Sequence, residues 1–162
     1  MKKIILSTVL LVCFSSLKSQ ISNFSELLSY YEMSLDAFNS NLSKKNNWVS
    51  MPVTHNNVGI RSTEKHHFAF RNSEEVQILG KSITYNQATD NVVESTFLLF
   101  DKSSLLGKLK SDLKKYGYIS EFSGDEVLLF SKNKTIVKIQ LQSLKENPIP
   151  DGAYEIVIVN AE

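Results

Sequence analysis

The stretch LGKLKSDLKKYGYISEFSGDEVLLF, residues 106–130, decides the fold that the sequence predicts. Its first leucines recur at spacings of three and four residues, which is the pattern of an amphipathic helix with one apolar face. Gly117 follows at a position where helices often end in a left-handed residue. Short apolar runs separated by turn-forming residues such as Gly124 then indicate strands. We therefore expect a helix that leads into an antiparallel meander.

A second, weaker copy of this pattern lies earlier in the chain. Four pairs of positions agree at a constant offset of 71 residues: Leu35 with Leu106, Phe38 with Leu109, Ser40 with Ser111 and Leu42 with Leu113. With one residue gapped, the segment 44–50 then matches the segment 114–120. This alignment puts Trp48 and Tyr118 at equivalent places, just after each helix. The match predicts a tandem duplication of one helix-plus-meander unit.

The first 19 residues have the features of a secretory signal peptide. A positive start at residues 1–3 precedes an apolar run at residues 4–14, and a more polar exit ends at Ser19. The run has 11 residues, about half of the roughly 20 that a membrane-spanning helix needs. We therefore expect cleavage after Ser19, export to the periplasm or the extracellular space, and no membrane span in the mature chain.

Cys13 is the only cysteine in the chain, and it lies inside the expected signal peptide. A lipoprotein would keep such a cysteine as its acylated first residue, but Val12 is bulky where lipoprotein signals usually carry a small residue. We therefore expect no lipid anchor at Cys13. A mature chain without this thiol forms no disulfide, so its stability has to come from a packed core.

The expected mature chain, residues 20–162, has the size of a single domain. Three of the 18 Lys and Arg leave with the signal peptide, so 15 remain against 17 Asp and Glu, which gives a net charge of about −2. A net charge this small gives the mature chain no strong electrostatic field of one sign. Nucleic acid is therefore a poor candidate for a partner.

The first half is predicted to contain one long helix and three or four strands. Asn23 and Glu26 resemble an N-terminal cap pair, and apolar residues at helical spacing extend the helix from about 24 to 45. Asn56, Asn57 and Gly59 indicate turns. Strands are predicted at about 60–71, at 76–79 (interrupted at Gly80 and resuming at 83–85) and at 92–100, and the segment 48–51 could form a fourth, short strand. The last of these is apolar on both faces, which is typical of a strand inside a sheet.

The second half is predicted to begin with a helix capped by Asp101 or Ser103. Gly107 inside this helix is unfavourable, and we expect a close approach of the helix to the sheet to compensate for it. Four strands then follow with turns between them, at 118–122, 126–130, 135–141 and 153–159.

Together these elements predict an α+β domain made of two tandem helix-plus-β-meander units, about 23–100 and 101–162. The order is helix, three or four strands, helix, four strands. Units of this size cannot bury their apolar surface alone, so we expect them to share a core. The units could pair as one antiparallel sheet with both helices on one face, or as a sandwich around the helices. Alternating strands such as 135–141 need one solvated face, which favours the continuous sheet.

Three histidines, His55, His66 and His67, lie near Glu64. A divalent metal accepts such ligands, so a metal-assisted hydrolase could use His55, Glu64 and His66. Adjacent residues on a strand point to opposite faces, however, so only one of His66 and His67 could join the other two. This spacing argues against a metal site. The simpler interpretation leaves His67 exposed and His66 partly buried.

The sequence carries no motif for covalent catalysis or for cofactor binding. It has no Gly-x-Ser-x-Gly motif, and its six glycines are scattered singly rather than gathered in a phosphate-binding loop. These features favour a protein without a cofactor and without catalytic activity. Active sites assembled in three dimensions can leave no such motif, so an enzyme stays an alternative.

Aromatic residues are more numerous than one small core needs. Trp48 and Tyr118 either fill equivalent ends of the core or line an exposed groove that recognises a partner. His66, His67 and Arg71, which share one predicted strand, would add polar contacts for specificity. These five residues are our candidate binding residues.

Tandem helix-plus-four-strand units are similar in shape to secreted inhibitor folds that present a concave sheet to a target protein. This likeness concerns shape alone and assigns no role to a residue. The function that the sequence favours is an exported, non-catalytic module that binds another protein or a small apolar ligand on its sheet face. The alternatives are the metal-assisted hydrolase and a carrier that holds an apolar molecule between helices and sheet.

Overall fold

The computed structural model describes residues 20–71, 75–124, 126–141 and 153–161. The expected signal peptide therefore lies outside the described residues. The described helices are α2 (Phe24–Tyr31), α3 (Leu35–Ser43) and α4 (Ser103–Lys115). The described strands are β1 (Trp48–Ser50), β2 (Thr54–Val58), β3 (Arg61–Arg71), β4 (Val76–Asn86), β5 (Asn91–Phe100), β6 (Ile119–Ser123), β7 (Val127–Lys132), β8 (Thr135–Leu141) and β9 (Tyr154–Asn160).

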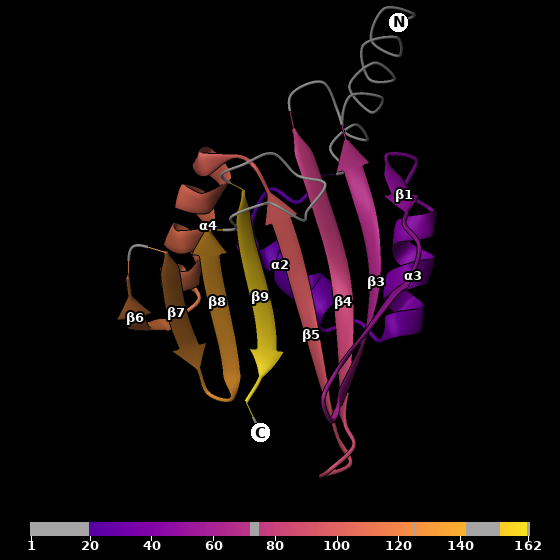
Figure 1. The fold of residues 1–162 in the computed structure, drawn as a ribbon. Helices are drawn as coiled ribbons and strands as arrows, with labels where there is room; N and C mark the ends of the chain where they lie inside the picture. Colours follow the sequence, from indigo (N-terminus) through magenta and orange to yellow (C-terminus); the bar gives the residue numbers. More distant parts are fainter. Residues whose placement is uncertain (1–19, 72–74, 125, 142–152, 162) are drawn as a thin grey trace, which may run out of the picture.

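All nine strands form one sheet, in which every described pair of neighbours is antiparallel. The order across the sheet is β1-β3-β4-β5-β9-β8-β7-β6, and β2 pairs with β3 beside β1 (Figure 1). The last strand of the chain therefore lies at the centre, against β5. The outermost strands β1 and β6 each come directly after a helix.

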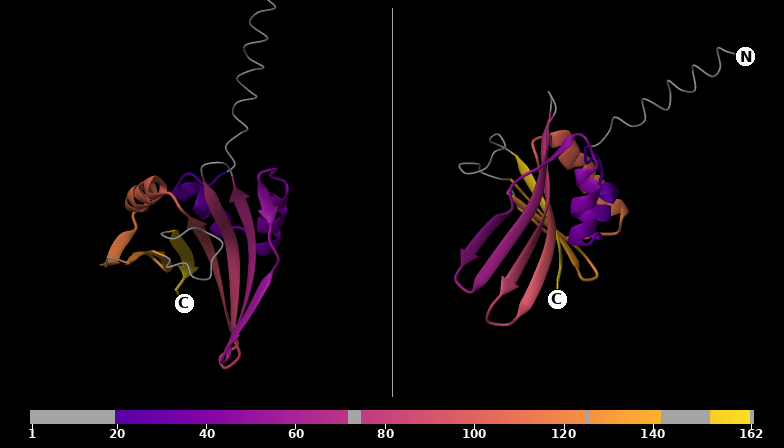
Figure 2. Two further views of the ribbon diagram at one scale, coloured as in Figure 1. Left: turned by 45° about the horizontal axis from the view of Figure 1, so that its top comes forward. Right: turned by 90° about the vertical axis from the view of Figure 1, so that its right-hand side faces the viewer.

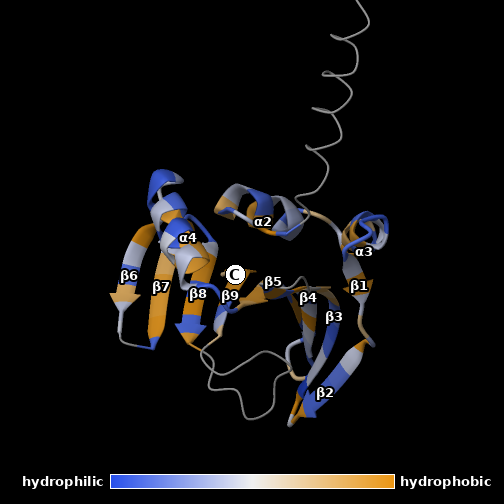
Figure 3. Cartoon of the chain, turned by 90° about the horizontal axis from the view of Figure 1, so that it is seen from above, coloured by the Kyte–Doolittle hydropathy of each residue, from blue (hydrophilic) through white to orange (hydrophobic). Residues whose placement is uncertain are grey.

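The helices cover one face of this sheet, as Figure 3 shows from above. Helix α2 lies over the centre and contacts β5 and α4, whereas α3 packs against the edge strand β1. An α+β architecture with an antiparallel sheet and the helices on one face was predicted, and the structure confirms it. We call the opposite side of the sheet the open face.

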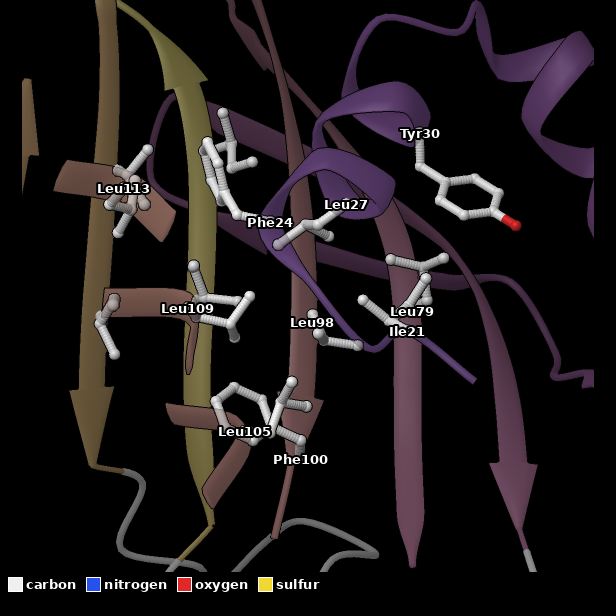
Figure 4. Packing of buried hydrophobic residues seen from close by; sticks show 14 of the residues in the cluster. Ile21, Phe24, Leu27, Tyr30, Leu79, Leu98, Phe100, Leu105, Leu109 and Leu113 are labelled. Carbon is white, nitrogen blue, oxygen red and sulfur yellow. The ribbon is translucent and has the colours of Figure 1, made fainter. Parts of the chain in front are cut away.

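The main core lies between the helices and the sheet (Figure 4). Phe24 and Leu27 of α2 meet Leu109 of α4 over the central strands, and all three side chains are fully buried. The strands supply Leu79, Leu98 and Phe100, which are also fully buried. Burying a side chain of this kind stabilises the fold by about 1.5–3 kcal/mol relative to leaving it exposed.

Ile21 extends this core at the amino-terminal end of the described chain. Its side chain is fully buried, and its backbone is bound by the buried Gln77 of β4. The Ile21 amide donates to Oε1 of Gln77 at 2.8 Å, and the Ile21 carbonyl accepts from Nε2 of Gln77 at 2.9 Å. One side-chain amide thus fixes both backbone groups of the residue.

The single helix expected over 24–45 is wrong, because the structure contains two helices there. Asn23 caps α2 as predicted, by accepting from the Glu26 amide at 2.9 Å. The chain then turns at 32–34, and Ser34 caps α3 by accepting from the Ala37 amide. The apolar periodicity runs across this break, since both helices pack the same stripe onto the sheet.

Four further expectations in the strands and in α4 are corrected. The cap expected from Asp101 or Ser103 is wrong, because Lys102 is the N-cap of α4 and no side chain caps the helix there. Asn56 and Asn57 belong to β2 rather than to a turn, and only Gly59 has the positive φ, +57°, of a turn residue. Gly80 does not interrupt a strand but lies in the middle of β4. Gly107 is exposed with open space beside it, so no close approach to the sheet explains it.

A smaller apolar cluster lies on the open face over β4 and β5. Ile78, Phe97 and Leu99 are more than nine-tenths buried there, although the helices are on the other side. The Phe97 ring lies over Gly80, its cross-strand partner, and a Cβ at Gly80 would come within 2.3 Å of that ring. The expectation that β5 is internal and buried on both faces is therefore confirmed.

Candidate functional site

Two surfaces of the sheet gather the residues that could carry function. The first is the helix-side face of β3, β4 and β5 where these strands run past α2, and we call it the shelf (Figures 1 and 2). The shelf exists because β9 pairs with β5 only from Ser95 onward, so β5 and its neighbours extend beyond it. The second surface is the open face over β6 to β9.

The shelf carries the three residues considered as metal ligands. His55 on β2 pairs with Glu64 on β3, and His66 lies two residues further along the same face. Glu64 Oε1 is hydrogen-bonded to Nε2 of His66, and its Oε2 lies 4.0 Å from Nδ1 of His55. In the described part of the chain, no three His, Cys, Asp or Glu side chains are arranged to hold a metal ion. The cluster is therefore a network of polar contacts around Glu64.

A cavity of about 530 Å³ lies on the shelf, beside this network. Its walls come from Tyr31 at the end of α2, from Lys81 on β4, from Val92 and Glu94 on β5, and from Asn160 at the end of β9. A cavity of this size is within the range of small-molecule sites. Elements that are far apart in the sequence therefore meet around one hollow.

Lys81 is the most deeply buried charged group of this cavity, with 2 % of its surface exposed. Its ammonium donates to the carbonyl oxygen of Tyr31 at 3.1 Å, which places a positive charge at the carboxyl end of α2. Burial lowers the pKa of Lys81, and the carboxylate of Glu94 opposes that shift. Helix capping is therefore one role of this lysine.

Thr96 lies directly opposite Lys81 on β5, on the same face of the sheet. It is fully buried, and its Oγ1 has no hydrogen-bond partner among the described residues. His66 pairs with Lys81 from the other side, on β3. Three polar side chains therefore form one row across the sheet where an apolar row would be expected, and such a row is unusual in a core.

The other candidate binding residues of β3 point away from the shelf. His67 is on the open face, partly exposed, and its Nδ1 is buried without a partner among the described residues. Burial lowers the pKa of His67, while the backbone of Lys65 acts in the opposite direction. Arg71 is the last residue of β3 and pairs with Val76, but its side chain lies outside the described part of the structure.

Trp48 and Tyr118 lie in the main core, with 5 % and 7 % of their surfaces exposed. The Trp48 ring packs on Phe70, its cross-strand partner, and the Tyr118 ring meets Phe24 edge to face. Burial raises the pKa of Tyr118. Their burial favours the role of core residues over that of residues lining an exposed groove.

Apolar side chains also face outward on the open face over β6 to β9. Ile119 and Phe122 of β6 are 68 % and 54 % exposed. Phe122 pairs with Leu129 of β7, and Ile136 of β8 and Val157 of β9 share the same face and are partly exposed. Polar side chains such as Lys138 and Gln140 of β8 share this face, as is normal for the solvent-exposed side of an antiparallel sheet. The strongly exposed apolar side chains are therefore those of β6.

A second cavity, of about 380 Å³, lies between α4 and the strands that it covers. The apolar part of its wall includes Leu106 of α4, Leu128 of β7 and Ile139 of β8. The wall is also polar, because Lys110, Glu126 and Gln140 line the same cavity. A carrier of apolar molecules would bind its ligand in this cavity.

Comparison of the chain with protein-family models, with curated protein sequences and with solved structures finds no match. None of the helices α2, α3 and α4, which are those of the described part, has the length and apolar character needed to cross a membrane. The functional argument therefore depends on the two surfaces and the two cavities.

Sequence reasoning missed Lys81 and Thr96, although a signal for them exists. Alternation along β4 places Lys81 between Leu79 and Ile83 on the inward face, and Thr96 precedes Leu98 on β5 in the same way. A lysine at an inward position of a strand is rare enough to mark a site. The interruption assigned to Gly80 hid this alternation.

Proposed function

We propose that this protein is an exported, non-catalytic module that binds another protein through the open face over β6 to β9. The observation that carries the proposal is the exposed apolar surface at Ile119 and Phe122 of β6, continued by the partly exposed Leu129 and Ile136. Exposed apolar surfaces of this kind are typical of protein interfaces. Export is supported by the composition of residues 1–19.

We also propose that the domain arose as two tandem units. The strand order supports this, because each unit begins with a helix and an edge strand and runs inward to a central strand. The central strands β5 and β9 pair antiparallel, as two related units would across a twofold axis. The equivalent places of Trp48 and Tyr118 in the core agree with the same relation.

Site-specific photocrosslinking in the cell of origin tests the open face. A photoreactive phenylalanine derivative at position 119 should crosslink to a partner protein, whereas the same group at position 58 should not. Val58 is the matched control, because it is also a strand residue that is 68 % exposed, and it lies in the β2–β3 hairpin away from β6. Equal crosslinking from both positions, or none from position 119, would contradict the proposal.

The cavity under α4 supports a second candidate function, that of a carrier of a small apolar ligand. Its wall includes five large apolar or aromatic side chains beside polar ones, and the apolar ones are Leu106, Leu128, Ile139, Leu141 and Tyr154. Mass spectrometry of protein purified without detergent should then find a bound lipid or another apolar molecule. Leu128→Trp, which fills the cavity, should remove that molecule, and protein that carries no such molecule in any preparation excludes the carrier.

A further inference from the structure

Lys81 forms the floor of the shelf cavity, and Thr96, which does not line the cavity, lies beside it on β5. Lys81 and Thr96 are a cross-strand pair with side chains on one face, so their Cβ atoms lie within about 5.5 Å. Lys81 is 2 % exposed and Thr96 is fully buried. Neither position is on the surface, where a charge or a hydroxyl would simply be hydrated.

Both groups have hydrogen-bonding capacity that the described residues leave unused. A lysine ammonium has three donors, and the structure gives that of Lys81 one acceptor, the Tyr31 carbonyl oxygen. Thr96 Oγ1 has no partner among the described residues. A buried charge with unfilled donors is costly unless an acceptor of opposite charge completes its shell.

We propose that the shelf cavity binds a small molecule through its carboxylate group, with the Lys81 ammonium as the counterion. A carboxylate is the acceptor that fits best, because its two oxygens can accept from the donors of the Lys81 ammonium that the Tyr31 carbonyl oxygen leaves unused. The cavity volume of about 530 Å³ has room for a ligand of amino-acid or dipeptide size. This site is independent of the proposed protein interface, which lies on the opposite face of the sheet.

Glu94 restricts which carboxylates fit. Its carboxylate lines the same cavity and is two residues from Thr96 along β5. A second negative charge on the ligand would be repelled there, whereas an amino group would be attracted. The site therefore selects a monocarboxylate, and prefers a zwitterion such as a free α-amino acid or a short peptide to a dicarboxylate.

Calorimetric titration of the purified mature protein tests the site with defined probes. The probes are propionate, free L-amino acids, alanyl-alanine and succinate, each up to millimolar concentration. We expect one of the monocarboxylates or zwitterions to bind, and succinate to bind at least about tenfold more weakly because of Glu94. Free amino acid and peptide are distinguished by which of these probes binds more tightly.

Variants connect any binding to the cavity floor. Lys81→Met keeps the length of the side chain and removes its charge, and it should weaken binding by about tenfold or more. Lys134→Met, at an exposed turn position, is the matched control and should bind as the wild type does. Glu94→Gln should raise the affinity for succinate relative to that for propionate.

A second variant keeps the test decisive if Lys81→Met fails to fold. Val92 is half exposed at the cavity wall, so Val92→Trp should fill the cavity without disturbing the core, and should abolish binding. Wild-type protein that binds none of the probes overturns the proposal. Binding that survives both Lys81→Met and Val92→Trp also overturns it, because the carboxylate would then bind elsewhere.

Discussion

The second half of the chain, from α4 to β9, is a plain meander under one helix, whereas the first half has a divided helix, an additional strand and longer strands. Strands β3, β4 and β5 contain 10 or 11 residues, and β6 to β9 contain five to seven. The longer strands run past the helices and form the shelf. The difference shows that strand length beyond the core, rather than the core itself, creates the polar cavity.

The two halves also differ in what covers the open face. Over β4 and β5 the apolar side chains Ile78, Phe97 and Leu99 are buried. Over β6 the side chains Ile119 and Phe122 stay exposed. The same side of one sheet is therefore a small core in the first half and a solvent-facing apolar surface in the second.

Core truncation at matched places in the two halves should have the largest effect. Leu42 of α3 and Leu113 of α4 are fully buried, so Leu42→Ala and Leu113→Ala should each lower the free energy of unfolding by about 2–5 kcal/mol. Because the halves share one core, urea unfolding followed by fluorescence should stay a single transition in both variants. Two separate transitions in either variant would show that the halves fold independently.

Gly80→Ala should have the next largest effect. The new methyl group would collide with the Phe97 ring and with the His66 carbonyl oxygen, at 2.3 and 2.8 Å, which should cost about 1–3 kcal/mol of unfolding free energy. Gly107→Ala in α4 is the matched control, since it meets open space and should stabilise by up to about 1 kcal/mol. Thermal unfolding measures both changes, and an unchanged stability of Gly80→Ala would contradict the packing of Phe97.

Lys81 should make the free energy of unfolding depend on pH in the alkaline range. Its pKa in the folded state is lowered from 10.5 by burial, so the unfolded state binds more protons in the interval below 10.5. The free energy of unfolding should therefore rise with pH through that interval, relative to Lys81→Met. Glu94, His66 and the Tyr31 carbonyl oxygen face this ammonium and are unchanged in the comparison. A constant difference between the two proteins across this range would contradict the burial of the charge.

His67 should cause a smaller pH dependence of the free energy of unfolding, with the same sign, at mildly acidic pH. Burial lowers its folded-state pKa from 6.5, so the unfolded state binds more protons below 6.5 and stability falls as the pH is lowered through that interval. His67→Gln should reduce this fall. Denaturant titrations of both proteins from neutral to mildly acidic pH measure the difference, and equal slopes would show that His67 is protonated without cost.

The end of α4 illustrates what local sequence can predict. Gly117 has the expected positive φ, +79°, its amide donates to the Lys114 carbonyl, and the Tyr118 amide donates to that of Leu113. These are the two bonds of a Schellman motif, which depends on a few adjacent residues. The four strands after it were also predicted within one or two residues, since each is bounded by turn residues.

The start of the chain illustrates what local sequence cannot predict. The stripe from Leu27 to Leu42 fits one helix as well as two, and Ser34 becomes a cap only because α3 packs on β1 while α2 packs on β5. Likewise, β2 is almost fully polar and exists through its pairing with β3. Such elements are defined by partners far along the chain, which periodicity does not reveal.

In the candidate site, too, contacts between residues close in the sequence could be predicted, and contacts between distant residues could not. The proximity of His55, Glu64 and His66 could be anticipated because they are close in the sequence. The cavity could not, because Tyr31, Lys81, Glu94 and Asn160 come from four separate elements.

The attachment of Ile21 to Gln77 has a consequence for the export that we propose. A peptidase that cut after Ser19 would have to hold the residues around that bond in an extended, accessible form, and Ile21 is two residues away. Burial of Ile21 in the core would compete with such cleavage for the same short segment. The proposal therefore predicts that the leader is removed before the domain closes around Ile21.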